Sequence, residues 1–568
     1  MRILVVGGYG TFGGRLARLL ADEERVELLI AGRSVVKAEA FLHELQSIAG
    51  AEGAQLRACR FDREGDLDEQ LARLAPDLVV DASGPFQGYG DNPYRLVSAV
   101  IKHHINYIDL ADASGFVNGI ATYDQAARAA DIYVLSGVSS FPVLTAAVVR
   151  RLSAGMARLT SVEGGIAPSP YAGVGLNVIK AITSYAGKPV KLKRDGRTQT
   201  ARGLVETQRR TIRPPGSLPL RNTLFSLVDV PDLRTLPSLW PSLQSVWIGA
   251  GPAPEILHRA LIGLSRLVHL GVIPTLSPFA GFFHRAINLL RWGEHRGGMY
   301  VDVTGIDSDG GKIRRSWHML AEGDHGPLIP SMAAEAIIRR CLDDRAPAAG
   351  ARSGAADLEL ADYERLFEKR DIKSGCWDVA TDDARTGAKP LYRLILGAAW
   401  ERLPAAIRAV HDFTDEYRLQ GIADVERGDG IIARSIAALF GFPATGAQIP
   451  AGVTFRVDNG REIWTRDFAG RRFSSIQSAG RGYAEGLLVE AFGPFRFNLA
   501  LITDGAKLRL VTRGWSLFGV PLPSVWAPTG DSFETEIDGR FRFHVEIRHP
   551  FCGLIVKYAG WLERSAGS

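Results

Sequence analysis

The chain has 568 residues, and at roughly 150 residues per domain this length predicts about three or four domains. Hydrophobic residues make up 46% of the chain and charged residues 23%, an ordinary globular composition that excludes a disordered chain, a fibre and a coiled coil. The net charge of +5 is a mild bias that does not imply a nucleic-acid partner, whereas an anionic cofactor or an acidic membrane surface would suit it equally well.

The cysteines indicate a compartment and argue against a metal site. The four of them, Cys59, Cys341, Cys376 and Cys552, form no short metal-ligand spacing, so we expect neither a metal site nor a disulfide framework. The cytoplasm is therefore the simple prediction. The N-terminus runs into glycines as a strand and not as a signal peptide, and no stretch of about 18 uncharged apolar residues predicts a spanning helix.

Residues 1–150 alternate predicted strands and helices. This spacing implies right-handed crossovers and an α/β fold with a Rossmann-type, doubly wound parallel sheet. The predicted strands begin at Ile3, Glu27, Leu56, Asp77, Asn106 and Ile132.

A glycine-rich segment follows the first strand and opens a helix, with the spacing Gly8-x-Gly10-x-x-Gly13 of a dinucleotide site. Gly8 is predicted to permit the tight turn, Gly10 to let a pyrophosphate approach the backbone, and Gly13 to let helix and strand pack closely. The helix N-terminus at Thr11 and Phe12 would offer free N–H groups to the phosphates. A glycine-rich structural turn is the alternative.

The second strand ends in Arg33-Ser34, about where an NAD site would have a ribose-binding Asp or Glu. A guanidinium and a hydroxyl fit a 2′-phosphate, because the fork donates bidentate hydrogen bonds to phosphate oxygens. The pair predicts NADP as cofactor, and an exposed arginine at a strand end is the alternative. Asp62, after the third strand, would cap the next turn or lie near the adenine.

Candidate catalytic residues follow the later strands. Ser83, Gly84 and Pro85 break the fourth strand at the carboxyl edge of the sheet, where ligands bind in this fold. The nicotinamide should lie beyond this edge. Hydride transfer needs geometry first and at most one proton donor, for which Tyr89 and Asp112 are the candidates. Structural roles in loops are the alternative for both.

Several segments together resemble a known family. They are Val5–Gly13, Asp77–Pro85, Tyr107–Leu110, Val228–Leu233 and Ala321–Pro327. In this order they resemble saccharopine-dehydrogenase-like proteins over about residues 1–345. That broad family includes lysine-pathway reductases, uncharacterised oxidoreductase-like proteins and trans-acting enoyl reductases of lipid synthesis, so the resemblance implies an NADP-dependent oxidoreductase.

One segment departs from that family. Ser139-Ser140-Phe141-Pro142 stands where amino-acid-metabolising members tend to have a Pro-Gly turn. A charged amino-acid substrate would also need a pocket with paired cations. We therefore favour an apolar or lipid-linked enoyl, keto or imine substrate over a free amino acid.

Residues 151–345 are predicted to form a mixed α+β domain for substrate binding or dimerisation, which closes the cofactor cleft as the resemblance implies. Within it, residues 255–292 form an apolar stripe with interleaved arginines and aromatic residues. Such a stripe fits an interfacial membrane helix, a hydrophobic lid that lines the substrate pocket, a homodimer contact, or a hairpin packed on its own domain.

The last part of the chain divides into a linker and a β-rich domain. Residues 346–390 begin with small, low-complexity sequence and are predicted as a linker. Residues 391–568 alternate polar and apolar residues, which predicts a curved antiparallel sheet or a partly closed barrel, compatible with a cavity for an apolar ligand. This region resembles a bacterial domain of unknown function that is often fused behind saccharopine-reductase-like domains. His411 and Asp415 share a helix face that suits metal ligation, with an exposed charged helix as the alternative.

Three hypotheses for function remain open. The first is an NADP-dependent oxidoreductase that transfers a hydride to an apolar or lipid-linked substrate. The second is a binding or scaffold protein that holds NADP without turnover, since fold does not imply function. The third is a membrane-surface protein of lipid metabolism recruited through residues 255–292.

Overall fold

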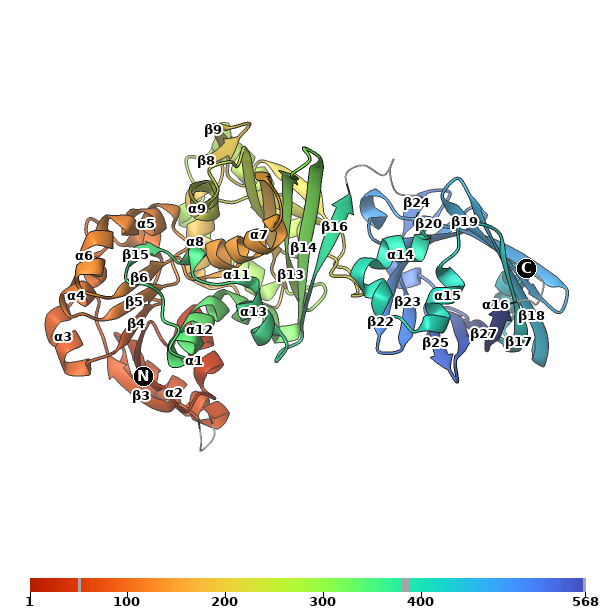
Figure 1. Ribbon diagram of the computed structural model, residues 1–568, viewed down its shortest axis with the longest axis horizontal. Helices are drawn as coiled ribbons and strands as arrows, with labels where there is room; N and C mark the ends of the chain where they lie inside the picture. The colour runs from red at the N-terminus through yellow and green to blue at the C-terminus, as the bar shows by residue number, and fades with distance from the viewer. Residues whose placement is uncertain (50–52, 381–388, 565–568) are drawn as a thin grey trace. The chain divides into compact units, whose positions relative to one another are not determined.

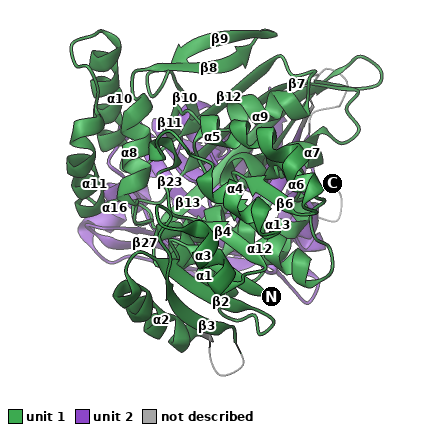
Figure 2. Ribbon diagram, turned by 90° about the vertical axis from the view of Figure 1, so that its left-hand side faces the viewer, with its two compact units in different colours: residues 1–210, 223–374 green, residues 211–222, 375–568 purple. Residues whose placement is uncertain are grey.

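The computed structural model describes residues 1–49, 53–380 and 389–564. The chain forms two compact units, each with its own core. Unit 1 comprises residues 1–210 and 223–374, and unit 2 comprises residues 211–222 and 375–568 (Figure 2).

Unit 1 contains the predicted Rossmann-type sheet, whose strands all pair in parallel (Figure 1). The strand order is β15-β6-β5-β4-β1-β2-β3, so the order reverses between β1 and β4. The strands are β1 Arg2–Val6, β2 Glu27–Gly32, β3 Gln55–Arg60, β4 Leu78–Asp81, β5 Asn106–Asp109, β6 Tyr133–Ser136 and β15 Gly350–Ser353. The helices of this part are α1 Thr11–Leu20, α2 Val35–Ala49, α3 Leu67–Leu74, α4 Arg95–Lys102, α5 Ser114–Gly119, α6 Asp124–Ala129 and α7 Thr145–Ser153.

The seventh strand corrects the predicted linker over 346–390. Gly350 pairs with Tyr133 of β6, and the Ala351 N–H donates to Asp124 Oδ1 at 2.9 Å. The residues of this strand are small and pack beside β6. Small residues show no alternation of large apolar and polar side chains, so the sequence pattern did not predict the strand. The region continues as α13 Leu360–Phe367, so unit 1 extends to Ser374, while residues 381–388 lie outside the described residues.

A second, mixed sheet completes unit 1. Its order is β10-β11-β12-β7-β13-β14-β16, in which β7 and β12 are parallel and the pairs β10–β11, β11–β12, β7–β13 and β13–β14 are antiparallel. The strands are β7 Arg158–Ala167, β10 Thr207–Arg210, β11 Thr223–Leu227, β12 Ser245–Ala250, β13 Arg296–Ile306, β14 Lys312–Glu322 and β16 Ile372–Ala380, with a separate hairpin of β8 Pro189–Arg194 and β9 Arg197–Arg202. The helices are α8 Leu176–Tyr185, α9 Asp232–Leu239, α10 Glu255–His269, α11 Ala280–Leu289 and α12 Ile329–Leu342.

Unit 2 is an antiparallel barrel of ten strands, which confirms the predicted β-rich domain and shows that its sheet closes. Closure comes from β22 and β23, which pair from Phe495↔Leu517 to Asp504↔Lys507. The strands are β17 Tyr417–Arg427, β18 Gly446–Asp458, β19 Arg461–Phe468, β20 Arg471–Ala479, β21 Leu488–Phe492, β22 Phe495–Asp504, β23 Lys507–Leu517, β25 Phe533–Ile537, β26 Arg540–His549 and β27 Gly553–Arg564, with β24 Val520–Leu522 added on β23. The helices are α14 Leu391–Leu396, α15 Ala405–His411 and α16 Ile431–Leu439.

His411 belongs to the core of this barrel, not to an exposed helix or a metal site. Its side chain is fully buried at the end of α15, stacks on Tyr392 and lies 2.6 Å from Glu534 Oε2 through Nε2. No group of three or more metal-ligating side chains occurs in the part of the chain that the structure describes. The same residues contain no helix with both the length and the hydropathy that crossing a bilayer needs.

Candidate functional site

The glycine loop joins β1 to α1 in a turn that glycine alone can form. Gly7 has a φ of +78°, and its carbonyl oxygen accepts from the Gly10 N–H at 2.8 Å. The tight turn is therefore at Gly7 and not at Gly8 as predicted. Gly8 is required for another reason: a Cβ there would lie 2.9 Å from the Val5 oxygen. A Cβ on Gly13 would overlap the Gly7 oxygen, which agrees with the predicted close packing of α1.

The first turn of α1 presents donors without partners. The N–H groups of Thr11, Phe12 and Gly13 make no hydrogen bond to another described residue, and no side chain caps the helix. Gly10, Thr11 and Phe12 line a cleft at the carboxyl edge of the parallel sheet. Free N–H groups and the positive end of a helix dipole form a binding site for phosphate oxygens.

The cleft has a volume of about 750 Å³ and lies where the strand order reverses. Ten of the predicted site residues line it: Gly10, Thr11, Phe12, Arg33, Asp62, Ser83, Gly84, Pro85, Tyr89 and Asp112. Gly8, Gly13 and Ser34 belong to the same loops but do not line the cleft. The start of α8, over residues 175–178, forms part of the wall, and Asn177 Nδ2 donates to the Gly84 oxygen at 2.9 Å.

One end of the cleft holds Arg33 and an aromatic residue that sequence reasoning missed. The Tyr9 ring lies against Gly32, where any Cβ would overlap it, and its hydroxyl accepts from the Ser34 N–H at 3.2 Å. The Arg33 side chain is exposed and has no ion pair or hydrogen bond within the described ranges. Nearby, Asp62 holds its own loop by accepting from the Glu64 N–H at 3.1 Å. Tyr9 lies between Gly8 and Gly10, so its place within the glycine motif could have predicted that it lines the cleft.

The other end of the cleft is built on Asp81, the last residue of β4, whose carboxylate is fully buried. Ser83 donates to Asp81 Oδ1 through its N–H at 3.0 Å and its hydroxyl at 2.5 Å. The Tyr89 hydroxyl lies 2.9 Å from Ser83 Oγ. The guanidinium of Arg63 stacks 3.2 Å from the centre of the Tyr89 ring, with its Nε 3.7 Å from Asp81 Oδ2.

The chemistry of Tyr89 follows from this setting. Burial and, after it, the negative charge of Asp81 raise the pKa of Tyr89 above its ordinary value. The phenol therefore stays protonated at neutral pH and is a hydrogen-bond donor in the cleft. Arg63 and Ser83 oppose this shift but do not reverse it.

Asp109 ends β5 directly beside Asp81, with which it pairs in register. Its Oδ1 accepts from Gly137 N–H at 2.8 Å, Ala111 N–H at 3.0 Å and Ser136 Oγ at 3.0 Å. Burial nevertheless raises the pKa of Asp109 to about 7, and the neighbouring Asp81 contributes to the shift. Sequence reasoning did not name either aspartate as a site residue, although each ends an apolar strand with a carboxylate.

Asp112 lies on the cleft wall, where its Oδ1 accepts from Gln87 Nε2 at 3.1 Å. Desolvation raises the pKa of Asp112, although the residue opens onto the cleft. Beyond Tyr89 lies a second recess of about 360 Å³. Its wall combines five aromatic residues with polar ones and one acidic side chain, and includes Phe86, Tyr89, Tyr94, Phe116, Tyr185 and Asp229.

The stripe at 255–292 does not line either recess, which corrects the prediction that it supplies the substrate lining. It forms α10 and α11 at one edge of unit 1 (Figure 2). One face packs on the unit, where Ile262 is buried and Ser226 Oγ lies 2.7 Å from His258 Nε2. The opposite face leaves large apolar side chains exposed.

Comparison with known families identifies one region. Residues 403–562 match a family model described as a domain of unknown function, DUF4166. The predicted likeness of the C-terminal region is thereby confirmed, for less than a third of the chain. No curated protein matches the sequence.

Solved structures that the chain resembles include saccharopine dehydrogenase, as the N-terminal motifs predicted. The apo enzyme (L-Glu forming) from Saccharomyces cerevisiae is 13% identical and has a TM-score of 0.48, with 67% of this chain and 100% of that chain covered. A mutant meso-dapdh with DAP from Clostridium tetani E88 is 12% identical and has a TM-score of 0.32. The match covers 65% of this chain and 98% of that chain. GenD2 from gentamicin A biosynthesis, in complex with NAD, is 14% identical and has a TM-score of 0.28. The match covers 55% of this chain and 71% of that chain. Likenesses this distant do not assign an activity or a substrate.

The packing of Gly13 gives a direct test of the loop. Because a Cβ at this position would overlap the Gly7 oxygen, Gly13→Val should displace α1 and abolish nucleotide binding, measured by titrating the fluorescence of NADPH. Gly115→Ala, in α5 where a Cβ meets no atom, is the matched control and should bind normally. Unchanged binding by a folded Gly13→Val protein would contradict the role of the loop.

Proposed function

We propose that unit 1 is an oxidoreductase that uses NADP(H) and acts on an apolar substrate. The observation that carries the proposal is one cleft with three components: the free N–H groups of α1, the unpaired guanidinium of Arg33 and the protonated hydroxyl of Tyr89. The donors at α1 suit a pyrophosphate, and Arg33 suits a 2′-phosphate. The glycines fit the same group, since side chains at these positions would fill the loop.

NADPH, when bound, would supply a hydride to a carbon of an enoyl, keto or imine group. The residues of this chain have the remaining tasks. The neighbouring atom of the substrate gains a proton, for which the Tyr89 hydroxyl is the donor, and a proton from solvent restores Tyr89. Ser83 orients that hydroxyl and is itself held by Asp81. Asp112, on the wall of the same cleft and with a pKa raised by desolvation, is the second candidate donor.

The recess beyond Tyr89 supports an apolar substrate. Its aromatic side chains suit an acyl or ring substrate, and the described residues that line it include no arginine or lysine to pair with a carboxylate. The preference for an apolar substrate thus rests on Phe86, Phe116 and their neighbours and no longer on residues 255–292.

The choice of NADP over NAD depends on Arg33. Arg33→Asp removes the partner of the 2′-phosphate and adds charge repulsion. A charge-assisted contact contributes roughly 1.5 to 3 kcal/mol, so the affinity for NADPH should fall about tenfold or more. Affinity for NADH should change little. Arg57→Asp, an exposed charge reversal on β3 outside the cleft, is the control. Equal NADPH affinity in both variants would contradict the assignment, and isothermal titration provides the measurement.

Activity and the role of Tyr89 are tested together. NADPH oxidation at a panel of medium-chain enals, ketones and imines should identify a substrate, and Tyr89→Phe should then lower kcat by about 10²-fold or more with little change in KM. Ser98→Ala, at an exposed position of α4, is a control that should keep full activity. Tight NADPH binding with no turnover of any apolar acceptor would favour the scaffold protein instead.

A separate observation favours a membrane-surface role, and we propose that the α10–α11 hairpin lies on anionic lipid. Phe282, Leu289 and Trp292 expose 68%, 82% and 68% of their surfaces. Residues 255–292 contain four arginines and one acidic residue, Glu255, which pairs with Arg259. Burial lowers the pKa of His258 to about 4, so this histidine adds no charge. Apolar side chains among arginines are the pattern of an interfacial helix.

Vesicle sedimentation tests the membrane proposal. The protein should bind vesicles that contain phosphatidylglycerol and not vesicles of phosphatidylcholine alone, and the double variant Phe282→Asp, Leu289→Asp should not bind. Ile432→Asp, which changes an exposed isoleucine of unit 2, should bind normally. If the protein is a dimer in solution without lipid, and only the double variant is a monomer, the hairpin would instead be a homodimer contact.

A further inference from the structure

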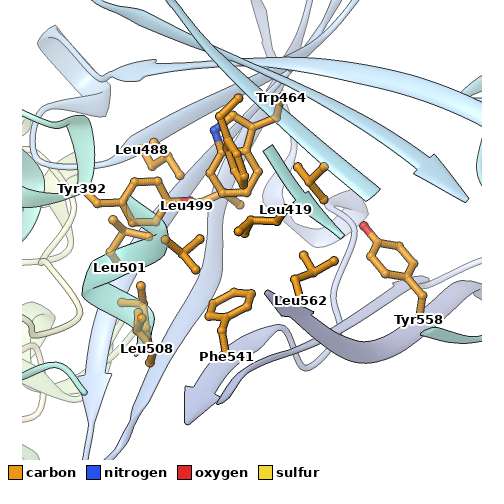
Figure 3. Close-up of a cluster of buried hydrophobic side chains, with 14 of the residues drawn as sticks. Tyr392, Leu419, Trp464, Leu488, Leu499, Leu501, Leu508, Phe541, Tyr558 and Leu562 are labelled. Atoms are coloured by element: carbon orange, nitrogen blue, oxygen red, sulfur yellow. The ribbon is translucent and has the colours of Figure 1, made fainter. Parts of the chain in front are cut away.

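The barrel of unit 2 encloses a cavity of about 360 Å³ that the proposed function does not use. Its wall comes from the inward-facing side chains of the barrel strands and from α14, α15 and α16. Most of these side chains are aromatic or aliphatic, and they include Phe442, Phe455, Phe468, Leu499, Leu510 and Phe541. Figure 3 shows buried side chains of the barrel core, among which Tyr392, Trp464 and Phe541 also line the cavity.

The size of the barrel explains why space remains. In a barrel of about eight strands the inward side chains nearly fill the interior or leave room for one small ligand, and the diameter grows with strand number. Ten strands therefore leave a gap, and an apolar gap loses the dispersion contacts that a filled core would make. A volume of this size falls in the range of sites for one small molecule.

Charges inside the barrel are matched to one another. Arg466 donates to Glu490 Oε1 at 3.0 Å and to Ser475 Oγ at 2.9 Å, and Gln477 Nε2 also donates to Glu490 Oε1 at 3.2 Å. Glu534 lies 2.6 Å from His411. Arg466 already has its carboxylate, and the other basic side chains among the described lining residues are the histidines His544 and His549. No described lysine or further arginine lines the cavity to pair with a carboxylate, sulfate or phosphate group, so a charged ligand would bear most of the cost of desolvation.

One phenol on the wall faces the cavity. Tyr558 of β27 is 6% exposed and lines the cavity, and its hydroxyl makes no hydrogen bond within the described residues. Burial raises the pKa of Tyr558 to about 12, so the phenol is a donor at neutral pH. Figure 3 shows its hydroxyl end turned toward the other side chains of the cluster. A ligand oxygen inside the cavity would give this hydroxyl a hydrogen-bond acceptor.

We propose that the barrel of unit 2 is a binding site for one uncharged, single-chain lipid whose alcohol or carbonyl oxygen accepts a hydrogen bond from Tyr558. The apolar chain fills the space among the phenylalanines and leucines, and the neutral head avoids the desolvation that an ionised head would suffer. This assignment does not depend on the function proposed for unit 1.

Fluorescence of the uncharged ketone probe 6-propionyl-2-dimethylaminonaphthalene tests the proposal on the full chain. The probe should bind with a blue-shifted emission, and 1-dodecanol should displace it. Dodecanoate and dodecylammonium, used below the concentrations at which they aggregate, should displace it at least tenfold less effectively. Displacement by dodecanoate or dodecylammonium as effective as that by dodecanol would overturn the choice of a neutral head.

Three variants locate the site. Leu510→Trp should fill the cavity and abolish probe binding, with the far-ultraviolet circular dichroism of the protein unchanged. Tyr558→Phe, which removes only the hydroxyl, should weaken dodecanol about five- to tenfold. Val36→Ser, at an exposed position of α2 in unit 1, is the control and should bind as the unchanged protein does. Normal dodecanol affinity in Tyr558→Phe, or loss of probe binding in Val36→Ser alone, would place the ligand elsewhere and overturn the proposal.

Discussion

Contact between the backbone of Gly7 and α1 at Gly13 is the constraint on which the candidate site depends. No side chain fits between Gly13 and the Gly7 oxygen, so the helix begins directly against the turn that ends β1. Gly7 in turn is held by its N–H, which donates to Ala31 of β2 at 2.9 Å. The free N–H groups of the first helical turn therefore lie at the carboxyl edge of the sheet, where the strand order reverses, and packing alone presents donors that would suit phosphate groups.

Opposite polarities meet in the same cleft. At the α1 and Arg33 end the unpaired groups are donors and a cation, which suit an anionic cofactor. At the other end the neighbouring strands β4 and β5 place two buried carboxylates, Asp81 and Asp109, side by side beneath Tyr89. Burial, with a contribution from the neighbouring Asp81, raises the pKa of Asp109 to about 7. The burial of Tyr89 and, after it, the charge of Asp81 raise the pKa of Tyr89 above its ordinary value. The barrel cavity of unit 2 has a third character, because its wall is mostly apolar, its arginine is already paired and the phenol of Tyr558 faces the cavity.

The Rossmann-type sheet could be predicted because its strands are apolar runs separated by helical patterns, and the loop residues Gly10, Arg33 and Ser83 could be placed because the carboxyl ends of parallel strands meet at one edge. Other features depend on contacts between distant residues and leave no local pattern. β15 consists of small residues that are buried only because β6 lies beside them. His411 is buried by Glu534, a residue far along the chain, and barrel closure depends on the pairing of β22 with β23. Hydropathy alone could not tell whether the stripe at 255–292 lines the cleft or lies at the surface.

The central claim is that the cleft of unit 1 holds NADPH with its nicotinamide beside Tyr89. A crystal structure of the full chain soaked with NADPH tests this claim most directly. We expect the pyrophosphate on the first turn of α1, the 2′-phosphate against Arg33, and the nicotinamide C4 within about 10 Å of the Tyr89 hydroxyl, the outer limit for a direct role in proton transfer. Density for the dinucleotide outside this cleft, or a nicotinamide farther than that from both Tyr89 and Asp112, would contradict the account.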